Sequence, residues 1–257
     1  GSGKTTTALA LMGYARNGCR ISAGRVQIGD TDVLALNAAQ QRGLRGRTVA
    51  YIAQSAAASF NPSRTIMDQV VEPTVIHGLC KRADAEAKAV QLFRELALPD
   101  PETIGARYPH QVSGGQLQRL MAAMALIGDP ELVILDEPTT ALDVTTQIEV
   151  LHAFRRVVRE RRATAVYVSH DLAVVAQMAD HILVLRNGRM RELNATGQIL
   201  AAPADEYTKS LLAAARPVPR ASAGATDDGR ELLLEVRQLS AGYGPVDAQG
   251  RPAKPIL

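Results

Sequence analysis

Short β-rich segments alternate with helical segments along most of this chain, and this alternation limits its fold more than any other feature. Residues 49–52 are β-rich, and residues 131–135, 165–168 and 182–185 are further short apolar runs. Such runs are typical of strands that are buried in a parallel sheet. We therefore predict an α/β domain with a mainly parallel core sheet.

Helical segments and one tight turn connect these runs. Helical spacing or good helix formers occur over residues 6–17, 83–98, 116–127, 145–162 and 171–178. Because helical segments predominate between about residues 55 and 130, we expect a helical subdomain between two core strands. The pair Asn187-Gly188 predicts a two-residue hairpin between strands at 182–185 and 189–193.

The chain changes character after residue 215. Residues 216–230 are rich in Pro, Ala, Ser and Gly and have no periodicity, which indicates a linker. Strand character resumes over residues 231–239. We therefore expect one domain over residues 1–215 and the start of a second over residues 231–257.

Charge and composition exclude several classes of protein. The net charge is only +3, and a chain with no Trp and three Phe has little material for base stacking, so we expect no nucleic-acid partner. The basic group at residues 159–162 fits a solvated helical face better than a nucleic-acid patch. No apolar run is long enough to span a membrane by itself. Two cysteines are too few for a disulfide framework or a zinc site.

The first residues carry the end of a phosphate-binding motif: Gly1, Ser2, Gly3, Lys4, Thr5 and Thr6. They match the last part of the pattern G-x-x-x-x-G-K-[ST], whose glycine turn points backbone N–H groups at phosphate oxygens. In that pattern the lysine, here Lys4, reaches the β- and γ-phosphates, and the Thr5 hydroxyl binds Mg²⁺. A Gly-Ser remnant of an affinity tag is the alternative origin of this turn.

Two carboxylates follow the apolar run at residues 132–135. Asp136 and Glu137 would lie at the carboxyl end of a buried strand, where ligands bind in open parallel sheets. There Asp136 can hold Mg²⁺, directly or through water, and Glu137 can orient or deprotonate an attacking water. A strand that simply ends in an acidic turn is the plainer interpretation.

Three further positions have a structural interpretation beside a functional one. Ser113, Gly114, Gly115 and Gln116 open a predicted helix, and Ser-x-x-Gln is a capping box as well as an anion-binding turn. His170 follows the strand at 165–168 and can contact a γ-phosphate or the attacking water, but a histidine before a helix more often packs or caps. Gln54, after the strand at 49–52, carries little weight alone.

Taken in order, these motifs resemble those of the ATP-binding cassette (ABC) ATPase family. The set comprises a partial Walker A at residues 1–6, the Q-loop Gln54, a signature turn at 112–116, Walker B at 132–137, a D-loop at 141–143 that ends in Asp143, and the H-loop His170. The signature turn begins with Val where the family usually has Leu. The resemblance covers residues 1–215 and implies a P-loop NTPase core with a helical subdomain, truncated at its N-terminus.

The resemblance also implies a mechanism and cofactors. Two cassettes pair head to tail, so that each ATP lies between the Walker A of one and the signature turn of the other. By resemblance, Thr5 and Asp136 support Mg²⁺ and Gln54 senses the metal or the water. Glu137 is then the general base, and His170 steadies the γ-phosphate.

Three stretches are similar to the peptide and nickel importer branch of the family: residues 58–62, 107–110 and 206–212. This likeness implies an ATPase at the cytoplasmic face of the membrane, with transmembrane permease subunits as partners and a solute-binding protein acting indirectly. Residues 231–257 look like the start of a second cassette, with Tyr243 where the family stacks an aromatic ring on adenine. The chain would then be part of a tandem ATPase and bind ATP poorly by itself. No iron–sulfur cluster is implied, because the cysteine-rich segment of some members is not found.

Two other functions compete with import. Tandem cassettes that act on ribosomes resemble Glu-Pro-Thr-Asn-His-Leu-Asp after Walker B, whereas residues 137–143 read Glu-Pro-Thr-Thr-Ala-Leu-Asp, which favours a transporter. A cassette of a DNA-repair or chromosome protein would need a long coiled-coil or zinc insert, and neither is found.

Overall fold

The computed structural model describes residues 2–139, 144–215, 239, 241–247 and 250–255 of the chain. They belong to two compact units, residues 1–216 and residues 217–257. In the described part of the second unit, β8 (Gly242–Val246) and β9 (Pro252–Pro255) form an antiparallel hairpin. All other described elements belong to the first unit.

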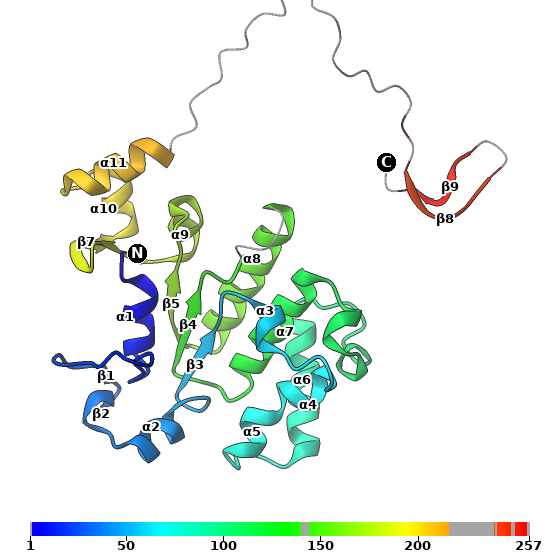
Figure 1. The fold of residues 1–257 in the computed structure, drawn as a ribbon, viewed down its shortest axis with the longest axis horizontal. Helices are drawn as coiled ribbons and strands as arrows, with labels where there is room; N and C mark the ends of the chain where they lie inside the picture. Colours follow the sequence, from blue (N-terminus) through cyan, green and yellow to red (C-terminus); the bar gives the residue numbers. More distant parts are fainter. Residues whose placement is uncertain (1, 140–143, 216–238, 240, 248–249, 256–257) are drawn as a thin grey trace, which may run out of the picture. The chain divides into compact units, whose positions relative to one another are not determined.

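Three parallel strands form the centre of the first unit: β3 (Val49–Ile52), β4 (Leu132–Asp136) and β5 (Thr164–Val168). Their order is β3-β4-β5, so β4 lies in the middle, and all of its residues are buried. Ile52 lies opposite Leu135 and Asp136 lies opposite Val168. The predicted parallel α/β core is therefore confirmed, and the carboxyl ends of the three strands lie at one edge of the sheet (Figure 1).

Alternate residues of β4 face different helical layers. Leu132 and Ile134 pack in an apolar cluster with α1 (Lys4–Ala10). Val133 and Leu135 pack in a larger cluster with α7 (Gly114–Leu126) and α8 (Val144–Glu160). Because side chains alternate along a strand, the sheet carries helices on both of its faces (Figure 1).

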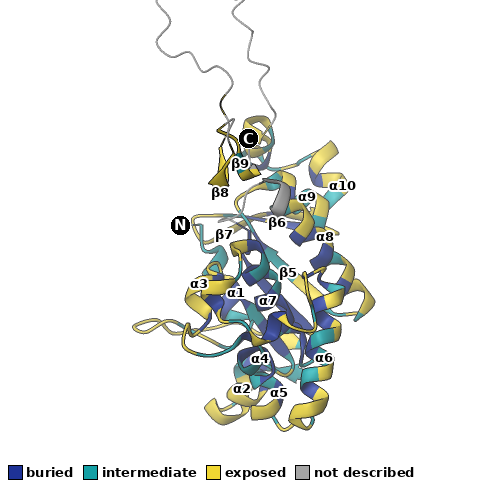
Figure 2. Ribbon diagram, turned by 90° about the vertical axis from the view of Figure 1, so that its right-hand side faces the viewer, coloured by how far each residue is buried: buried dark blue, intermediate teal, exposed yellow. Residues whose placement is uncertain are grey.

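Every described element between β3 and β4 is helical. This insert contains α3 (Ala56–Ser59), α4 (Ile66–Val70), α5 (Glu72–Ile76), α6 (Arg82–Glu95), short 3₁₀ turns at Ile104–Ala106 and Pro109–Gln111, and α7. Leu92, Phe93 and Leu120 are fully buried and share one apolar cluster with the sheet. Figure 2 shows the buried residues in dark blue along the inner faces of the helices, and the exposed outer faces in yellow.

The remaining elements lie before β3 and after β5. Those before β3 are the pair β1 (Gln27–Ile28) and β2 (Thr31–Asp32), a 3₁₀ turn at Val33–Ala35, and α2 (Ala38–Leu44). Those after β5 are α9 (Leu172–Met178), β6 (His181–Arg186), β7 (Arg189–Ala195), α10 (Thr196–Ala201) and α11 (Glu206–Ala215). In the described part of the chain, no helix combines the length and apolar character that crossing a bilayer requires.

The hairpin turn predicted at Asn187-Gly188 is confirmed. Strands β6 and β7 pair antiparallel, and the two turn residues have φ of +50° and +72°. Positive φ at both central residues is the requirement of the tight turn that joins twisted strands, and Asn and Gly adopt it at little cost.

Two expectations from the sequence are corrected. The first helix ends at Ala10 rather than continuing to residue 17, because the chain turns there and Gly13 takes a φ of +62°. The solvated face expected at residues 159–162 is confirmed at residues 159, 160 and 162, which are exposed, and is wrong for Arg161. The Arg161 side chain is only 18% exposed and pairs with Glu95 at 3.0 Å and with Asp129, so it joins α8 to α6 and to the turn before β4.

Of the strand expected at residues 231–239, only Leu239 is described, and it lies in no element.

The central strand predicts a large stability effect. Ile134 is fully buried, so Ile134→Ala should lower the free energy of unfolding by about 2–5 kcal/mol through lost burial and the cavity left behind. Ile76→Ala is the matched control, because Ile76 is 72% exposed and the change should stay within about 0.5 kcal/mol. Urea unfolding followed by circular dichroism measures both. Equal effects of the two substitutions would contradict the assignment of β4 as the centre of the core.

Candidate functional site

Several residues singled out in the sequence lie together at the carboxyl ends of the three central strands. Asp136 is the last residue of β4 and Glu137 follows it, while His170 lies just after β5 and Gln54 just after β3. The strands are parallel and in register, so their carboxyl ends bring these separate segments together. Helix α1 contributes Thr5 to the same edge.

The carboxylate of Asp136 is held by two donors from different elements. Its side chain is buried, since the residue is only 4% exposed. Oδ1 accepts a hydrogen bond from Thr5 Oγ1 at 3.2 Å, and Oδ2 accepts one from the Tyr51 hydroxyl at 2.8 Å. A buried carboxylate requires such donors, and here they tie α1 and β3 to the end of β4.

Glu137 has an unusual backbone conformation. Its φ is +49°, a left-handed value that a glutamate seldom adopts, and its N–H donates to the Val168 carbonyl at 2.9 Å. Its Oε2 lies 3.3 Å from Gln54 Nε2, which donates to it, and 3.3 Å from His170 Nδ1. The backbone therefore turns sharply at Glu137. The Glu137 carboxylate contacts Gln54, which follows β3, and His170, which follows β5. Strain of this kind is concentrated at functional sites.

The glycine turn at the start of α1 lies against the β6–β7 turn. Gly3 has a φ of +93°, and a Cβ at this position would lie 3.4 Å from the Gly188 Cα atom. The N–H of Gly188 donates to the Ser2 carbonyl at 3.0 Å, so the β6–β7 turn supports the glycine turn. Lys4 Nζ donates to Ser2 Oγ at 3.2 Å, and Thr6 is exposed. Gly1 lies outside the described residues.

The Ser113 turn has the complete geometry of a capping box. Ser113 Oγ accepts from the N–H of Gln116 at 3.3 Å, and Gln116 Oε1 accepts from the N–H of Ser113 at 2.9 Å. The structural interpretation of this motif therefore holds. Ser113 and Gly114 are also exposed, and none of the hydrogen bonds among described residues joins this turn to Asp136 or Glu137. Asp143 lies outside the described residues.

Sequence reasoning missed two tyrosines near this edge. Burial, followed by the bond to Asp136, raises the pKa of the Tyr51 hydroxyl well above its ordinary value. Burial likewise raises the pKa of Tyr167, which lies on β5 with its hydroxyl 3.4 Å from Thr139 Oγ1. Tyr51 stands in the β-rich run at 49–52, and its aromatic hydroxyl next to a predicted site strand was the signal available in the sequence.

The donor set at Asp136 suits a magnesium ion. Magnesium prefers oxygen ligands in octahedral geometry at about 2.1 Å, which puts adjacent ligands roughly 3 Å apart. The hydroxyl of Thr5 and Oδ1 of Asp136 are 3.2 Å apart, close to that separation. Among the described residues no cluster of three or more His, Cys, Asp or Glu side chains could form a metal cage, and Mg²⁺ in nucleotide sites is usually held by only one or two protein ligands.

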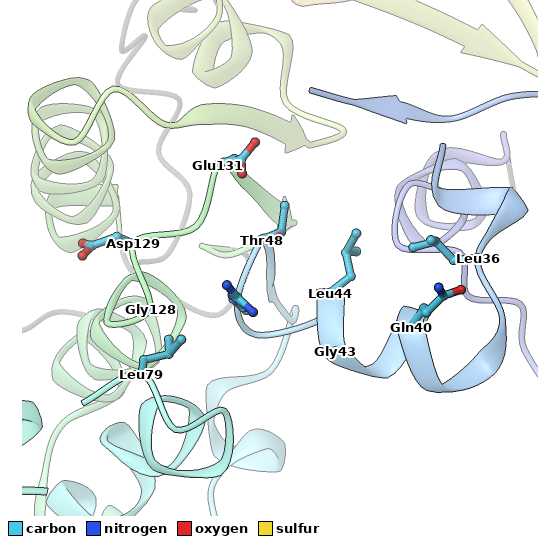
Figure 3. A pocket seen from close by; sticks show the side chains of 10 residues that line it. Leu36, Gln40, Gly43, Leu44, Thr48, Leu79, Gly128, Asp129 and Glu131 are labelled. Atoms are coloured by element: carbon cyan, nitrogen blue, oxygen red, sulfur yellow. The ribbon is translucent and has the colours of Figure 1, made fainter. Parts of the chain in front are cut away.

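A separate hollow of about 510 Å³ lies at the opposite, amino ends of β3 and β4. Figure 3 shows Leu44, Thr48, Gly128 and Glu131 around it. None of the predicted site residues lines it. Because ligands of open parallel sheets bind at the carboxyl ends of the strands, we place the candidate site at that edge rather than in this hollow.

Comparisons with known proteins find relatives over most of this chain. The sequence profile described as ABC transporter matches residues 1–140. The dipeptide transport ATP-binding protein DppD of Bacillus subtilis is 36% identical over 221 residues, which are 86% of this chain and 65% of DppD. The glutathione import ATP-binding protein GsiA of Escherichia coli K12 is 40% identical over 220 residues, which are 83% of this chain and 35% of GsiA.

Among solved structures, the chain is similar to the dimeric post-hydrolysis state of the ATP-binding cassette MJ0796 bound to ADP and Pi. The TM-score is 0.64 at 23% identity, and the match covers 76% of this chain and 81% of that one. This likeness confirms the predicted cassette fold. The chain itself spans less than two thirds of the length of DppD or GsiA.

The capping box predicts how substitutions of Ser113 should behave. Ser113→Ala removes the acceptor for the Gln116 N–H and should lower the free energy of unfolding by about 1 kcal/mol. Ser113→Asn preserves an N-cap acceptor and should cost much less. Urea unfolding of the two variants provides the comparison, and equal losses would contradict the cap.

Proposed function

The chain belongs to the ABC transporter family, and we propose that it is the ATP-hydrolysing part of a transporter that imports a peptide or a similar solute. One observation carries the proposal. At the carboxyl ends of the strands, Thr5 hydrogen-bonds to Asp136, Gln54 hydrogen-bonds to Glu137, and His170 lies 3.3 Å from the same Glu137 carboxylate.

We infer that the start of α1 and the end of β4 hold the nucleotide. The turn formed by Gly1, Ser2, Gly3, Lys4, Thr5 and Thr6 would surround the phosphates with backbone N–H groups, and Lys4 would add a positive charge. Thr5 and Asp136 would hold Mg²⁺, with Gln54 close by. When bound, this ion neutralises charge on the phosphates. The 3.2 Å contact of Thr5 with Asp136 supports this assignment.

Glu137 is the proposed general base. A water between its carboxylate and the γ-phosphate would be oriented for attack, and its proton would pass to Glu137. The Gln54 amide donates to Oε2 and would restrict the rotation of the carboxylate. The His170 side chain is 65% exposed and in contact with the same oxygen, so it can reach a phosphate held there.

In this proposal, a second cassette completes the nucleotide-binding site. Ser113, Gly114, Gly115 and Gln116, together with Asp143, would contact the nucleotide of the partner. The exposure of Ser113 and Gly114 at the N-terminus of the long helix α7 supports this role, because such a terminus attracts anions.

The names of the relatives support a proposal for the partners and the location. DppD is named for dipeptide transport and GsiA for glutathione import, which favours a peptide-like solute over nickel. We propose transmembrane permease subunits as the direct partners, a solute-binding protein as an indirect one, and the cytoplasmic face of the membrane as the location. The same names do not favour a cassette that acts on ribosomes.

The role of Glu137 predicts a separation of binding from turnover. In the full gene product, Glu137→Gln should lower the rate of ATP hydrolysis by at least about 100-fold, because the amide cannot accept the proton of the water. Binding of a fluorescent ATP analogue should change little. Glu131→Gln is the matched control, since Glu131 lies at the other end of β4, and it should retain normal turnover. Unchanged turnover in Glu137→Gln would remove Glu137 from the base role.

Uptake measurements test the solute class. Deletion of the full gene should abolish energy-dependent uptake of labelled dipeptides or glutathione, and the wild-type gene should restore it where Glu137→Gln does not. Loss of nickel uptake instead would redirect the proposal to metal import. Normal uptake of all three solutes in the deletion strain would overturn the import function.

A further inference from the structure

Tyr51 makes the shorter of the two hydrogen bonds that hold Asp136. Its hydroxyl lies 2.8 Å from Oδ2, whereas Thr5 Oγ1 lies 3.2 Å from Oδ1. We propose that Tyr51 is a positioning residue, which holds the Asp136 carboxylate with Oδ1 toward Thr5, where Oδ1 and the Thr5 hydroxyl would hold the magnesium ion. This inference rests on the proposed function of the same site.

The sheet register explains why a tyrosine can do this. Tyr51 lies opposite Ile134 in the parallel pairing of β3 with β4. Side chains two residues apart share a face of a strand, so Ile134 and Asp136 lie on the face against which Tyr51 packs. The long side chain of Tyr51 extends along this face to the end of β4, where a Ser or Thr hydroxyl at the same position would be too short to reach.

The hydrogen bond from Tyr51 to Asp136 is important because Asp136 is buried. With 4% of the residue exposed, water offers little replacement for a lost donor. If the Tyr51 hydroxyl were removed, Oδ2 would lose its short bond and the carboxylate would be less restricted in rotation. Partners that orient a metal ligand in this way typically contribute about 10-fold to 100-fold in metal affinity or activity.

Tyr167 offers a matched comparison. Both tyrosines are half-buried on strands that flank β4, Tyr51 on β3 and Tyr167 on β5. The Tyr167 hydroxyl contacts Thr139 at 3.4 Å and not Asp136. If Tyr51 only fills space, Tyr→Phe should therefore have the same small effect at both positions.

The experiment measures how strongly Mg²⁺ enhances nucleotide binding. The dissociation constant of a fluorescent, non-hydrolysable ATP analogue is determined for the full gene product in EDTA and in saturating Mg²⁺. The ratio of the constant in EDTA to the constant in Mg²⁺ measures how much the metal site strengthens nucleotide binding. Mg²⁺ also binds the free nucleotide, but this contribution is the same for every variant and does not affect their comparison. Tyr51→Phe should reduce this ratio about 10-fold and leave the constant in EDTA within about twofold, whereas Tyr167→Phe should change neither.

A second variant separates positioning from packing. In an Asp136→Asn background, Tyr51→Phe should cause no further loss of the Mg²⁺ enhancement, because the carboxylate that it orients is already gone. Urea unfolding shows that each variant is folded. An unchanged ratio in folded Tyr51→Phe, or an equal loss with and without Asp136, would overturn the positioning role while leaving the proposed ATPase intact. Failure of the parent protein to bind the analogue with Mg²⁺ would overturn the proposed function, and this inference with it.

Discussion

The buried carboxylate of Asp136 has to be satisfied by donors from outside its own strand, and the arrangement of the site depends on this requirement. Leaving such a group unpaired in the interior costs several kcal/mol, on the order of a large part of the stability of a domain. Thr5 meets it from α1 and Tyr51 from β3. Because these elements are separated by long stretches of sequence, the same bonds that stabilise the carboxylate also bring the glycine turn to the end of the central strand.

The turn at Glu137 extends this arrangement across the sheet. Its left-handed backbone ends β4 abruptly, and its N–H bonds to Val168 at the end of β5. The side chain then lies in contact with Gln54 after β3 and with His170 after β5. Glu137 therefore contacts residues that follow both neighbouring strands. Its strained backbone conformation is maintained because the preceding strand, β4, is buried along its whole length.

The sequence predicts features that depend on neighbouring residues better than those that depend on tertiary contacts. The strand that precedes Asp136, the hairpin at Asn187 and the cap at Ser113 are set by residues a few positions apart, and all were predicted. The bond of Tyr51 depends on the register between two strands that a helical insert separates, which no local pattern specifies. The pairing of Arg161 with Glu95 depends in the same way on how α8 packs against α6. The roles of the site residues stay predictions, since geometry alone gives contacts and not chemistry.

The capping box at Ser113 does not compete with an anion-binding role. The box uses the side chain of Ser113 and the N–H of Gln116. The first turn of any α-helix has several N–H groups without an intrahelical acceptor, and that of the exposed Gly114 is not used by the box. A capped helix start is rigid, so this N–H group is already oriented before an anion arrives. The same residues thus serve stability within this chain and can serve recognition toward a partner, which explains why a local interpretation of the motif was correct without excluding the functional one.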